Sequence, residues 1–379
     1  MEVIVNLKDF KAGYFKQQLQ YKSFYPTTVD RQWLVDDPKI NVLLEKATQL
    51  LGELNAFSLI VPDVDLFIRM HIVKEANSSS GIEGTQTSID EAVMKKEEIA
   101  PEKRDDWQEV RNYVDAINYA VGKLAEFPLS NRLLRDTHAV LMAGVRGGRK
   151  YPGEFRVSQN WIGGSNLSDA VFIPPHPDDV PGLMGDLEKF WHDEEIDVPH
   201  LIKIAISHYQ FETIHPFLDG NGRIGRLLIT LYLVNHQLLA KPTLYLSDFF
   251  EKHRPSYYDA LSRVRESNDL IHWLKFFLNA VITTSDKGKN TFIGIFKLRE
   301  KFENRILTLG RKTQNAKKLL QFLYSKPIVT VQDVQAELKI SERTARDMLQ
   351  EMIRLELLQE VMGYKRNRVF SFKSYLDLF

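Results

Sequence analysis

The stretch from His215 to Leu239 constrains the fold of this chain more than any other segment. Residues 227–239 are apolar almost all round the helix that they are expected to form. Such a helix belongs in the middle of a hydrophobic core, because each of its faces needs burial. The residues before it, 215–226, read His-Pro-Phe-Leu-Asp-Gly-Asn-Gly-Arg-Ile-Gly-Arg. A polar, glycine-rich turn is therefore expected on a rigid support.

The composition of this turn suits the binding of phosphate. Gly220 and Gly222 allow a sharp turn and present bare N–H groups, which form an anion cradle together with the helix N-terminus. Arg223 and Arg226 are three residues apart, so both guanidinium groups are expected along one face of the first helical turn. Two such planar, multi-donor groups can hold a polyphosphate.

Three further side chains of the turn could supply chemistry. Asp219 could hold Mg²⁺, which binds few carboxylates together with substrate phosphates. His215 titrates near neutral pH and could take a proton from an attacking hydroxyl. Asn221 could fix the loop or donate to a phosphate oxygen. Each residue alone also fits ordinary turn chemistry or a structural histidine, but their combination favours a functional site.

Residues 215–226 match, position for position, the signature of Fic-domain proteins, His-Pro-Phe-x-Asp/Glu-Gly-Asn-Gly-Arg-x-x-Arg. The chain thus resembles the Fic/DOC family, whose characterised members mostly transfer AMP from ATP to a protein hydroxyl. The resemblance implies that His215 is the general base and that Asp219 coordinates Mg²⁺ on the α- and β-phosphates. It implies that the ATP-binding residues are His215, Gly220, Asn221, Gly222, Arg223, Ile224, Gly225, Arg226 and Tyr257. Family members that use another donor, or that remove AMP, stay open as alternatives.

A second motif, Ser79-Ser-Gly-Ile-Glu83-Gly, precedes the first. Alone, it is a short Ser/Gly-rich turn that ends a helix and carries one acid. It resembles the inhibitory motif of Fic proteins, Ser/Thr-x-x-x-Glu-Gly/Asn. The resemblance implies an inhibitory role for Ser79 and Glu83, in which the Glu83 carboxylate pairs with Arg226 and removes it from the γ-phosphate.

The predicted fold class is mainly α. It comprises a helical Fic core with a small β-hairpin flap and a C-terminal winged helix. The expected regions are an N-terminal helical part (1–105) that carries the 79–84 motif, a catalytic domain (106–290), a linker (291–309) and a winged-helix domain (310–379). Within the first part, residues 1–35 look irregular and Ser88 is a plausible helix N-cap. Other helices are expected near 38–55, 62–78, 106–126, 130–143, 178–193, 199–213, 222–239, 247–268 and 269–285.

Two segments are expected to complete the active site. Short apolar runs around a Gly-Gly-Ser-Asn turn predict a β-hairpin at 157–173. The resemblance implies that this hairpin is a flap on which a target protein docks by strand addition. It also implies that the segment after the central helix closes over the adenine, with Tyr257 preferred over Tyr258 for stacking on the base.

In the C-terminal region, residues 315–324, a second helix capped by Thr330 and a third, 342–355, capped by Ser341 precede short strands around a basic turn at 363–367. This order resembles a winged helix. The third helix mixes Arg343, Arg346 and Arg354 with acids, so DNA is the less favoured partner and protein docking the alternative. A DNA-bound regulator that only senses nucleotide stays the second hypothesis for the whole chain.

Bulk composition narrows the remaining classes. The formal net charge is zero and there is no cysteine, which excludes disulfides, thiol catalysis and cysteine-based zinc sites. The chain shows no signal peptide and no membrane span, so a cytoplasmic location and no membrane partner are expected. The resemblance makes a homodimer plausible.

Overall fold

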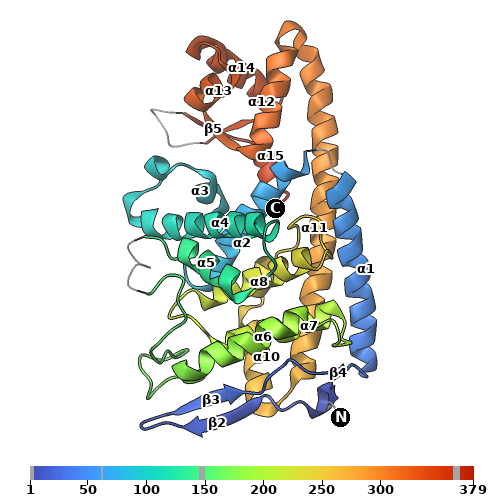
Figure 1. Cartoon of the computed structure of the whole chain (residues 1–379). Coiled ribbons are helices and arrows are strands. Elements are labelled where there is room, and N and C mark those ends of the chain that lie inside the picture. The colour runs from blue at the N-terminus through green and yellow to red at the C-terminus, as the bar shows by residue number, and fades with distance from the viewer. Residues whose placement is uncertain (1–3, 61–62, 145–149, 362–367) are drawn as a thin grey trace.

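The computed structural model describes residues 4–60, 63–144, 150–361 and 368–379, and the chain is mainly helical, as predicted (Figure 1). Helix α8 (Asn221–Asn235) contacts α2, α4, α5 and α7, which surround it. All of its residues from Arg223 to Leu233 are buried. The expected central helix is therefore confirmed, and the motif turn that opens it stands on the core.

The helices around α8 follow the predicted order, with some changed bounds. They are α2 (Val64–Ile82), α3 (Ile89–Val93), α4 (Arg104–Leu124), α5 (Asn131–Leu141), α6 (Val180–His192), α7 (His200–Ile214), α9 (Ser247–Lys252) and α10 (Arg254–Ser267), with single turns η2 (Lys96–Glu98), η3 (Pro101–Lys103) and η4 (Pro177–Asp179). Ser88 caps α3 in a capping box with Glu91, which confirms that N-cap. The single helix expected at 247–268 is instead two helices, because the chain bends at His253, just before the proline in the first turn of α10.

Two long helices, α1 (Pro38–Ile60) and α11 (Leu270–Ile306), pack against each other along one side of the molecule (Figure 1). Most of the expected linker at 291–309 is thus helical, and the short 3-10 segment η5 (Leu307–Lys312), which is kinked at Gly310, follows it. Two glycines of α11 allow close packing: a Cβ on Gly288 would lie 3.0 Å from Leu54, and one on Gly294 would lie 2.9 Å from Leu378. The C-terminal region is therefore joined to the core by a rigid element.

The N-terminal segment departs from the expected irregular chain. It forms η1 (Leu7–Asp9) and four short strands, β1 (Val5–Asn6), β2 (Gly13–Gln17), β3 (Lys22–Pro26) and β4 (Trp33–Leu34). Strands β2 and β3 make an antiparallel hairpin in which Phe15 faces Phe24. The turn between them, Gln18 to Tyr21, has none of the Asn-Gly or Gly-Gly pairs that mark a hairpin, so the sequence pattern missed it.

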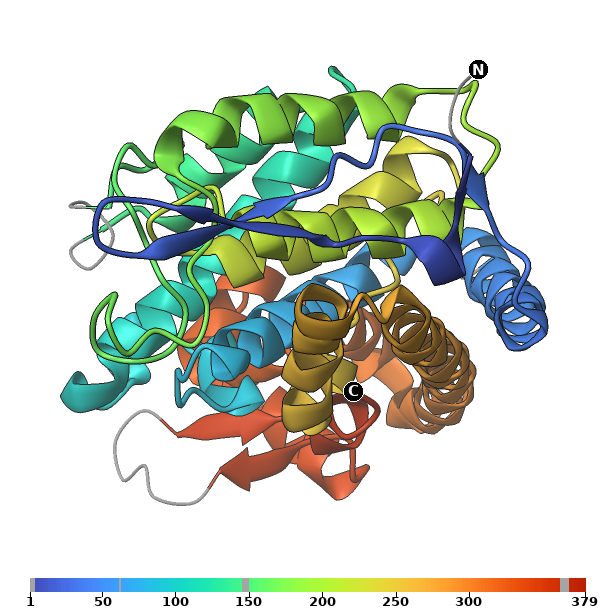
Figure 2. The same cartoon turned by 90° about the horizontal axis from the view of Figure 1, so that it is seen from below.

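The predicted flap at 157–173 is much less regular than a β-hairpin. Among the described residues, one isolated antiparallel bridge, Ile162 with Phe172, joins its two arms. Side chains hold the rest: Gln159 donates to the Pro174 carbonyl at 3.0 Å, and Arg156 donates to that of Pro175 at 2.6 Å. The outer arm of the flap, residues 171–173, accepts a hydrogen bond from the N–H of Phe24 in β3. The N-terminal hairpin therefore lies beside the flap (Figure 2).

The C-terminal region shows the predicted order of helices and strands. It contains α12 (Thr313–Ser325), β5 (Ile328–Thr330), α13 (Val331–Leu338), α14 (Glu342–Arg354), β6 (Gln359–Val361), β7 (Val369–Ser371) and α15 (Lys373–Leu376). The three strands form an antiparallel sheet in the order β5-β7-β6. Thr330 and Ser341 cap α13 and α14 as expected. The winged-helix assignment stays a prediction, and the basic turn at 363–367 lies outside the described residues.

The C-terminal region packs on the helix that carries the 79–84 motif. Near the start of α2, Phe67 contacts the rings of Tyr324 and Tyr375, and His71 contacts that of Phe379. One end of α2 is therefore fixed against the C-terminal region, and its other end points to the motif turn.

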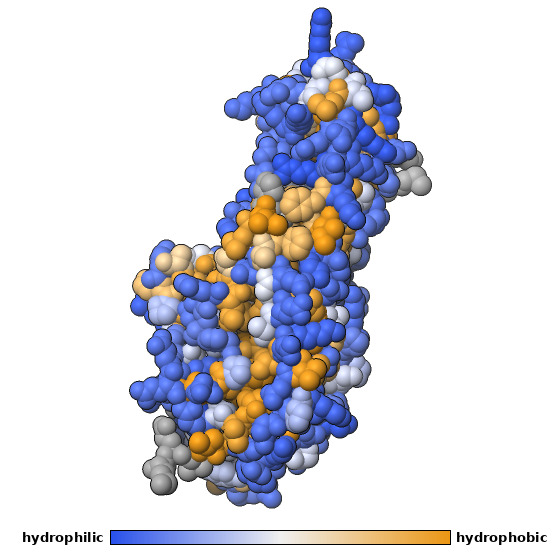
Figure 3. Space-filling model, turned by 90° about the vertical axis from the view of Figure 1, so that its right-hand side faces the viewer, coloured by the Kyte–Doolittle hydropathy of each residue, from blue (hydrophilic) through white to orange (hydrophobic). Residues whose placement is uncertain are grey.

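Apolar residues cluster on the surface of the side of the molecule that α1 forms (Figure 3). Exposed apolar residues of α1 include Val42, Leu59 and Ile60. The predicted homodimer stays a prediction. Among the described helices, none combines the length and the apolar character needed to span a membrane.

Candidate active site

His215 lies where α7 ends, in a left-handed backbone conformation with φ 52° and ψ 61°. This conformation costs free energy for a residue with a Cβ, so neighbouring groups must hold it. Arg156 Nε and Asn160 Nδ2 donate to the His215 carbonyl at 2.9 and 3.1 Å. The turn breaks α7 and places the His215 side chain in the wall of a cavity.

The imidazole of His215 is neutral at physiological pH. Burial lowers its pKa to about 4, and the charge of Arg156 acts in the same direction. Within the described part of the chain, its buried Nδ1 atom has no hydrogen-bond partner. A neutral imidazole keeps one ring nitrogen as an acceptor, which is the form that a general base requires.

Asn221 fixes the loop, one of the two roles that the sequence left open. Its side chain accepts a hydrogen bond from the Phe217 N–H and donates to the Phe217 carbonyl, both at 2.8 Å. Gly220, directly before Asn221, has φ 75°, a left-handed conformation that suits glycine. Asn221 therefore ties the end of the loop to its beginning.

His138, which was not found from the sequence, packs against this loop. His138 of α5 stacks on Phe217, with the ring centroids 3.9 Å apart, and its Nε2 lies 3.0 Å from the Asp219 carbonyl oxygen. Burial lowers the pKa of His138 to about 4, so its ring is neutral as well. Nothing in the local sequence around 138 points to this contact, because the two partners lie far apart in the chain.

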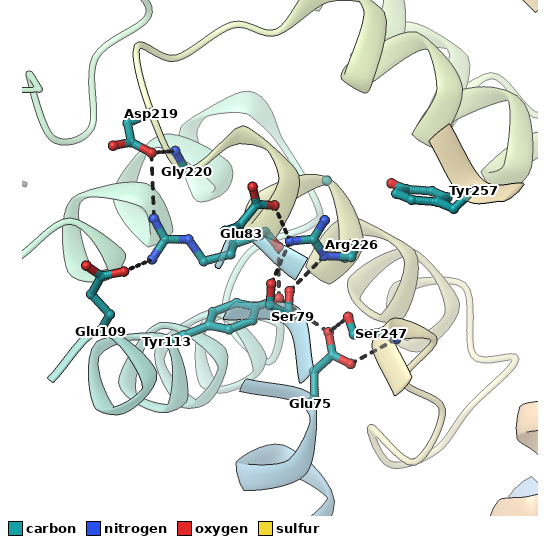
Figure 4. A network of polar contacts seen from close by, with 12 residues as sticks. Glu75, Ser79, Glu83, Glu109, Tyr113, Asp219, Gly220, Arg226, Ser247 and Tyr257 are labelled. Carbon is teal, nitrogen blue, oxygen red and sulfur yellow. Dashed lines mark hydrogen bonds and ion pairs between the residues drawn. The ribbon is translucent and has the colours of Figure 1, made fainter. Parts of the chain in front are cut away.

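The two motif arginines face different partners, contrary to the expectation that they act along one face. Arg223 lies 3.7 Å from Asp219 and 3.7 Å from Glu109. Arg226 instead donates through Nε to Ser79 Oγ at 2.8 Å and through Nη2 to a Glu83 oxygen at 2.6 Å (Figure 4). In this state the two guanidinium groups do not form one clamp.

The predicted contact between Glu83 and Arg226 is present. Glu83 follows directly after α2, which continues four residues beyond its expected end at 78. The Ser79 carbonyl accepts a further hydrogen bond from Arg226 at 3.0 Å. Burial acts to raise the pKa of Glu83, but the charge of Arg226 prevails and lowers it below its ordinary value. The carboxylate is therefore charged at neutral pH and the ion pair is complete.

A second acid, Glu75, anchors α2 one turn before Ser79 and was not found from the sequence. It is buried and accepts hydrogen bonds from Ser247 Oγ at 2.5 Å and from the Ser247 N–H at 3.2 Å (Figure 4). Tyr113 of α4 lies 3.5 Å from the same carboxylate and donates to the Arg223 carbonyl at 2.8 Å. Glu75 and Tyr113 thus connect the motif helix, α8 and the start of α9.

The cavity beside the motif turn is lined by several elements. Its lining includes Glu83, Trp161, His215, Asp219, Arg226 and Tyr258. It therefore brings together α2, the flap, the motif turn and α10. The predicted ATP-binding residue Ile224 instead points into the core, where it is fully buried.

The structure changes the preference between the two tyrosines of α10. Tyr257 is 1% exposed, stacks on Phe250 with the centroids 4.5 Å apart, and lies 2.8 Å from His208 through its hydroxyl. Tyr258 is 39% exposed, and both tyrosines line the cavity beside the motif turn. Tyr258 thus offers ring surface to a base, whereas Tyr257 is mainly a core residue.

Asp219 suits a magnesium ion that a phosphate brings with it. Its side chain is 47% exposed, and one oxygen accepts from the Gly220 N–H at 2.6 Å. Over the described residues, no cluster of three or more His, Cys, Asp or Glu residues could hold a metal by itself. Magnesium usually takes one or two carboxylates, and its other ligands are water and phosphate oxygens.

The fold and the site together define a mainly helical protein in which a signature turn opens the buried central helix. Residues 42–122 match the Fic/DOC family N-terminal region, and residues 128–233 match the Fic/DOC family domain. The chain therefore contains a Fic/DOC family N-terminal region followed by a Fic/DOC family domain.

Relatives and solved structures agree with this assignment. The chain is 33% identical over 135 residues to the protein adenylyltransferase Fic of Aedes aegypti. This match covers 35% of this chain and 24% of that relative. The corresponding protein of Drosophila erecta gives the same identity and coverage. The chain thus matches only about a quarter of the length of these relatives.

The fold is also that of solved Fic structures. A Fic family protein from Desulfovibrio desulfuricans has a TM-score of 0.56 and 21% identity, covering 89% of this chain and 97% of that one. Fic-1 from C. elegans has a TM-score of 0.51 and 20% identity, covering 69% of this chain and 75% of that one.

Proposed function

We propose that this chain transfers AMP from ATP to a Ser, Thr or Tyr hydroxyl of a protein, itself included. The observation that carries the proposal is the neutral His215 imidazole beside the Gly220–Gly222 turn at the N-terminus of α8. A base and an anion-binding turn on one rigid element are what attack on a phosphate requires. The names of the relatives from Aedes aegypti and Drosophila erecta support this reaction.

In the proposed reaction, the α-phosphate lies against the N–H groups of the motif turn. His215 accepts the proton of the target hydroxyl, whose oxygen forms a bond to the α-phosphorus. The bond from the α-phosphorus to the bridging oxygen breaks, and pyrophosphate leaves. The backbone N–H groups, Arg223 and Arg226 stabilise the negative charge that develops on the phosphates. Magnesium on Asp219, when bound, would neutralise further charge on the α- and β-phosphates.

The proposed docking edge for the target is the inner arm of the flap, residues 161–163. The Ile162 N–H and carbonyl both bond to Phe172, so in an extended arm the N–H and carbonyl groups of Trp161 point to the opposite side. The outer arm is already covered by Phe24 of β3. A target strand is therefore expected along Trp161 to Gly163, residues that also line the cavity.

DNA binding by the C-terminal region is not part of this proposal. Arg346 and Arg354 of α14 form ion pairs with Glu342 and Glu351 of the same helix. Arginines that are paired along their own helix present a weaker basic surface to DNA phosphates.

Intact-mass spectrometry of the Glu83→Gly chain after incubation with Mg²⁺ and ATP tests the proposal. The expected result is a species heavier by one AMP less one water, because an adenylyl group replaces the hydroxyl hydrogen, with release of pyrophosphate. Addition of EDTA should abolish it, because Asp219 needs magnesium to act on the phosphates. A mass increase equal to a phosphate, or neither adduct nor pyrophosphate in the presence of candidate target proteins, would contradict AMP transfer.

Replacement of Tyr258 by alanine should raise the KM for ATP by about 5- to 150-fold, since a base–aromatic stack contributes about 1–3 kcal/mol. The kcat should change less, because the motif turn is untouched. Steady-state labelling with α-labelled ATP measures both constants. Tyr14→Ala, an exposed tyrosine on β2, is the control. An unchanged KM in Tyr258→Ala would remove Tyr258 from the base site.

A further inference from the structure

Three acids line the cavity beside the motif turn, and the proposed function uses only two of them. Asp219 is the expected magnesium ligand and Glu83 pairs with Arg226. The third, Glu212, lies on α7 one turn before His215 and has no role in the proposed reaction. Its environment indicates what it could bind.

Glu212 is buried in the cavity wall, and one of its carboxylate oxygens has no hydrogen-bond partner in the described part of the chain. Glu212 is 8% exposed, and the oxygen that has no hydrogen-bond partner among the described residues is Oε1. A buried polar oxygen without a partner costs about 1–3 kcal/mol. Such a group in a cavity wall is typical of a site that is completed by a ligand.

The backbone of α8 leaves room for this carboxyl group. A Cβ on Gly225 would lie only 2.3 Å from Glu212 Oε1, so any other residue at 225 would displace the acid. Gly222 bears the same relation to Glu83, whose Oε1 would lie 2.3 Å from a Cβ there. Gly222 and Gly225 therefore accommodate two acids, one in an ion pair and one without.

Among the described residues, Glu212 makes no direct ion pair, although the charges of Arg226 and Arg265 act on it at longer range. Arg226 is already paired with Glu83 and Ser79, and the described part of the chain shows no ion pair between Glu212 and either cavity arginine. Arg265 of α10 lies over the ring of Phe172 instead, 4.1 Å from its centroid. Glu212 is therefore free to accept a hydrogen bond from a molecule in the cavity.

We propose that Glu212 accepts a hydrogen bond from the nucleoside of the bound donor, either from the exocyclic amine of the base or from a ribose hydroxyl. This inference rests on the proposed function, because it needs the phosphates on the motif turn. The phosphates would occupy the N–H groups and Arg226, which leaves the nucleoside as the part of the donor that carries hydrogen-bond donors. A carboxylate accepts from such groups, and acidic side chains bind ribose hydroxyls in other nucleotide sites.

Equilibrium binding by calorimetry tests this proposal in the Glu83→Gly, His215→Ala chain, which frees Arg226 and prevents turnover. Four ligands are compared: ATP, inosine triphosphate, 2′-deoxy-ATP and 3′-deoxy-ATP. Inosine triphosphate lacks the exocyclic amine, and each deoxynucleotide lacks one hydroxyl. One of the analogues should bind about 10-fold more weakly than ATP, as expected for loss of a hydrogen bond to a charged group.

Substitution of Glu212 identifies the acceptor. The penalty is the loss of affinity for that analogue relative to ATP. In Glu212→Gln this penalty should shrink to about 3-fold, and in Glu212→Leu it should vanish. Glu266→Gln, an exposed acid of α10, is the control and should keep the full penalty. Equal binding of all four ligands by the parent chain, or an undiminished penalty in both Glu212 variants, would overturn the role of Glu212. No binding of any of the four triphosphates would instead contradict the proposed function itself.

The pH dependence of the penalty is a further readout. Burial raises the pKa of Glu212 to about 7, with Glu83 from α2 acting in the same direction and with Arg226 from α8 and Arg265 from α10 opposing it. The neutral Tyr257 of α10 and the neutral His215 also face this part of the cavity. Because the ionised form is the stronger acceptor, the penalty should grow as the pH rises from about 5 to about 8. The midpoint of this rise should lie at or below about pH 7, because the tested chain lacks Glu83, whose charge raises the pKa of Glu212. A penalty that stays flat over this range would contradict acceptance by the carboxylate.

Discussion

Replacement of His215 by alanine is expected to reduce AMP transfer by about 10²- to 10⁴-fold, which is the usual contribution of a positioned general base. The physical reason is the neutral ring, whose pKa burial lowers to about 4, at the end of α7 beside the anion-binding turn. Transfer is measured with α-labelled ATP in the Glu83→Gly background, where the signal is largest.

The binding of ATP should survive this substitution, because the motif N–H groups and the arginines remain. Equilibrium binding of ATP to His215→Ala therefore separates lost chemistry from lost structure. His253→Ala, which removes an exposed histidine, should leave transfer unchanged. Transfer by His215→Ala at more than a tenth of the parent rate would remove His215 from the role of base.

The Glu83→Gly substitution is expected to raise transfer by about 10- to 1,000-fold. The ion pair at 2.6 Å now holds Arg226 away from a γ-phosphate. Coupling energies of close charge pairs of about 1.5–4 kcal/mol correspond to this range of rates. Glu83→Gln should give a smaller rise, because its amide oxygen can still accept from Arg226.

The same variant should be less stable than the parent chain by about 1–2 kcal/mol, because buried Arg226 loses its counter-charge while Ser79 still accepts from it. Denaturant unfolding measures this loss. Higher transfer with lower stability is the signature of a released inhibitory contact. Glu97→Gln, an exposed acid of η2, is the control and should change neither property. Equal transfer rates in Glu83→Gly and the parent chain would mean that the ion pair does not inhibit.

The parts of the site that are local in sequence could be predicted. The apolar run after the motif predicted a buried helix, and α8 is buried over all residues from Arg223 to Leu233. The contact of Glu83 with Arg226 followed from the resemblance of two separate motifs, and the structure contains it. Its inhibitory effect stays a prediction for the Glu83 variants to test.

Other parts left no local signal. Glu75, His138 and Glu212 each lie in helices where a polar residue reads as an ordinary member of the pattern. Their partners are Ser247, the Asp219 carbonyl and the space above Gly225, which only folding brings near. The expected helix at 269–285 instead continues to Ile306 as α11, where it packs against α1, and Gly294 leaves room for Leu378.

The sequence by itself determined the chemistry of the motif turn, because a base, an acid, glycines and arginines in consecutive positions act through local geometry. The tertiary structure decided how that chemistry is held and restrained. Arg226 could have joined Arg223 in one phosphate clamp, but α2 brings Glu83 and Ser79 from about 145 residues away and occupies it. Long-range packing of α2 by Glu75, Tyr113 and the C-terminal region sets this contact, and no pattern within a single segment encodes it.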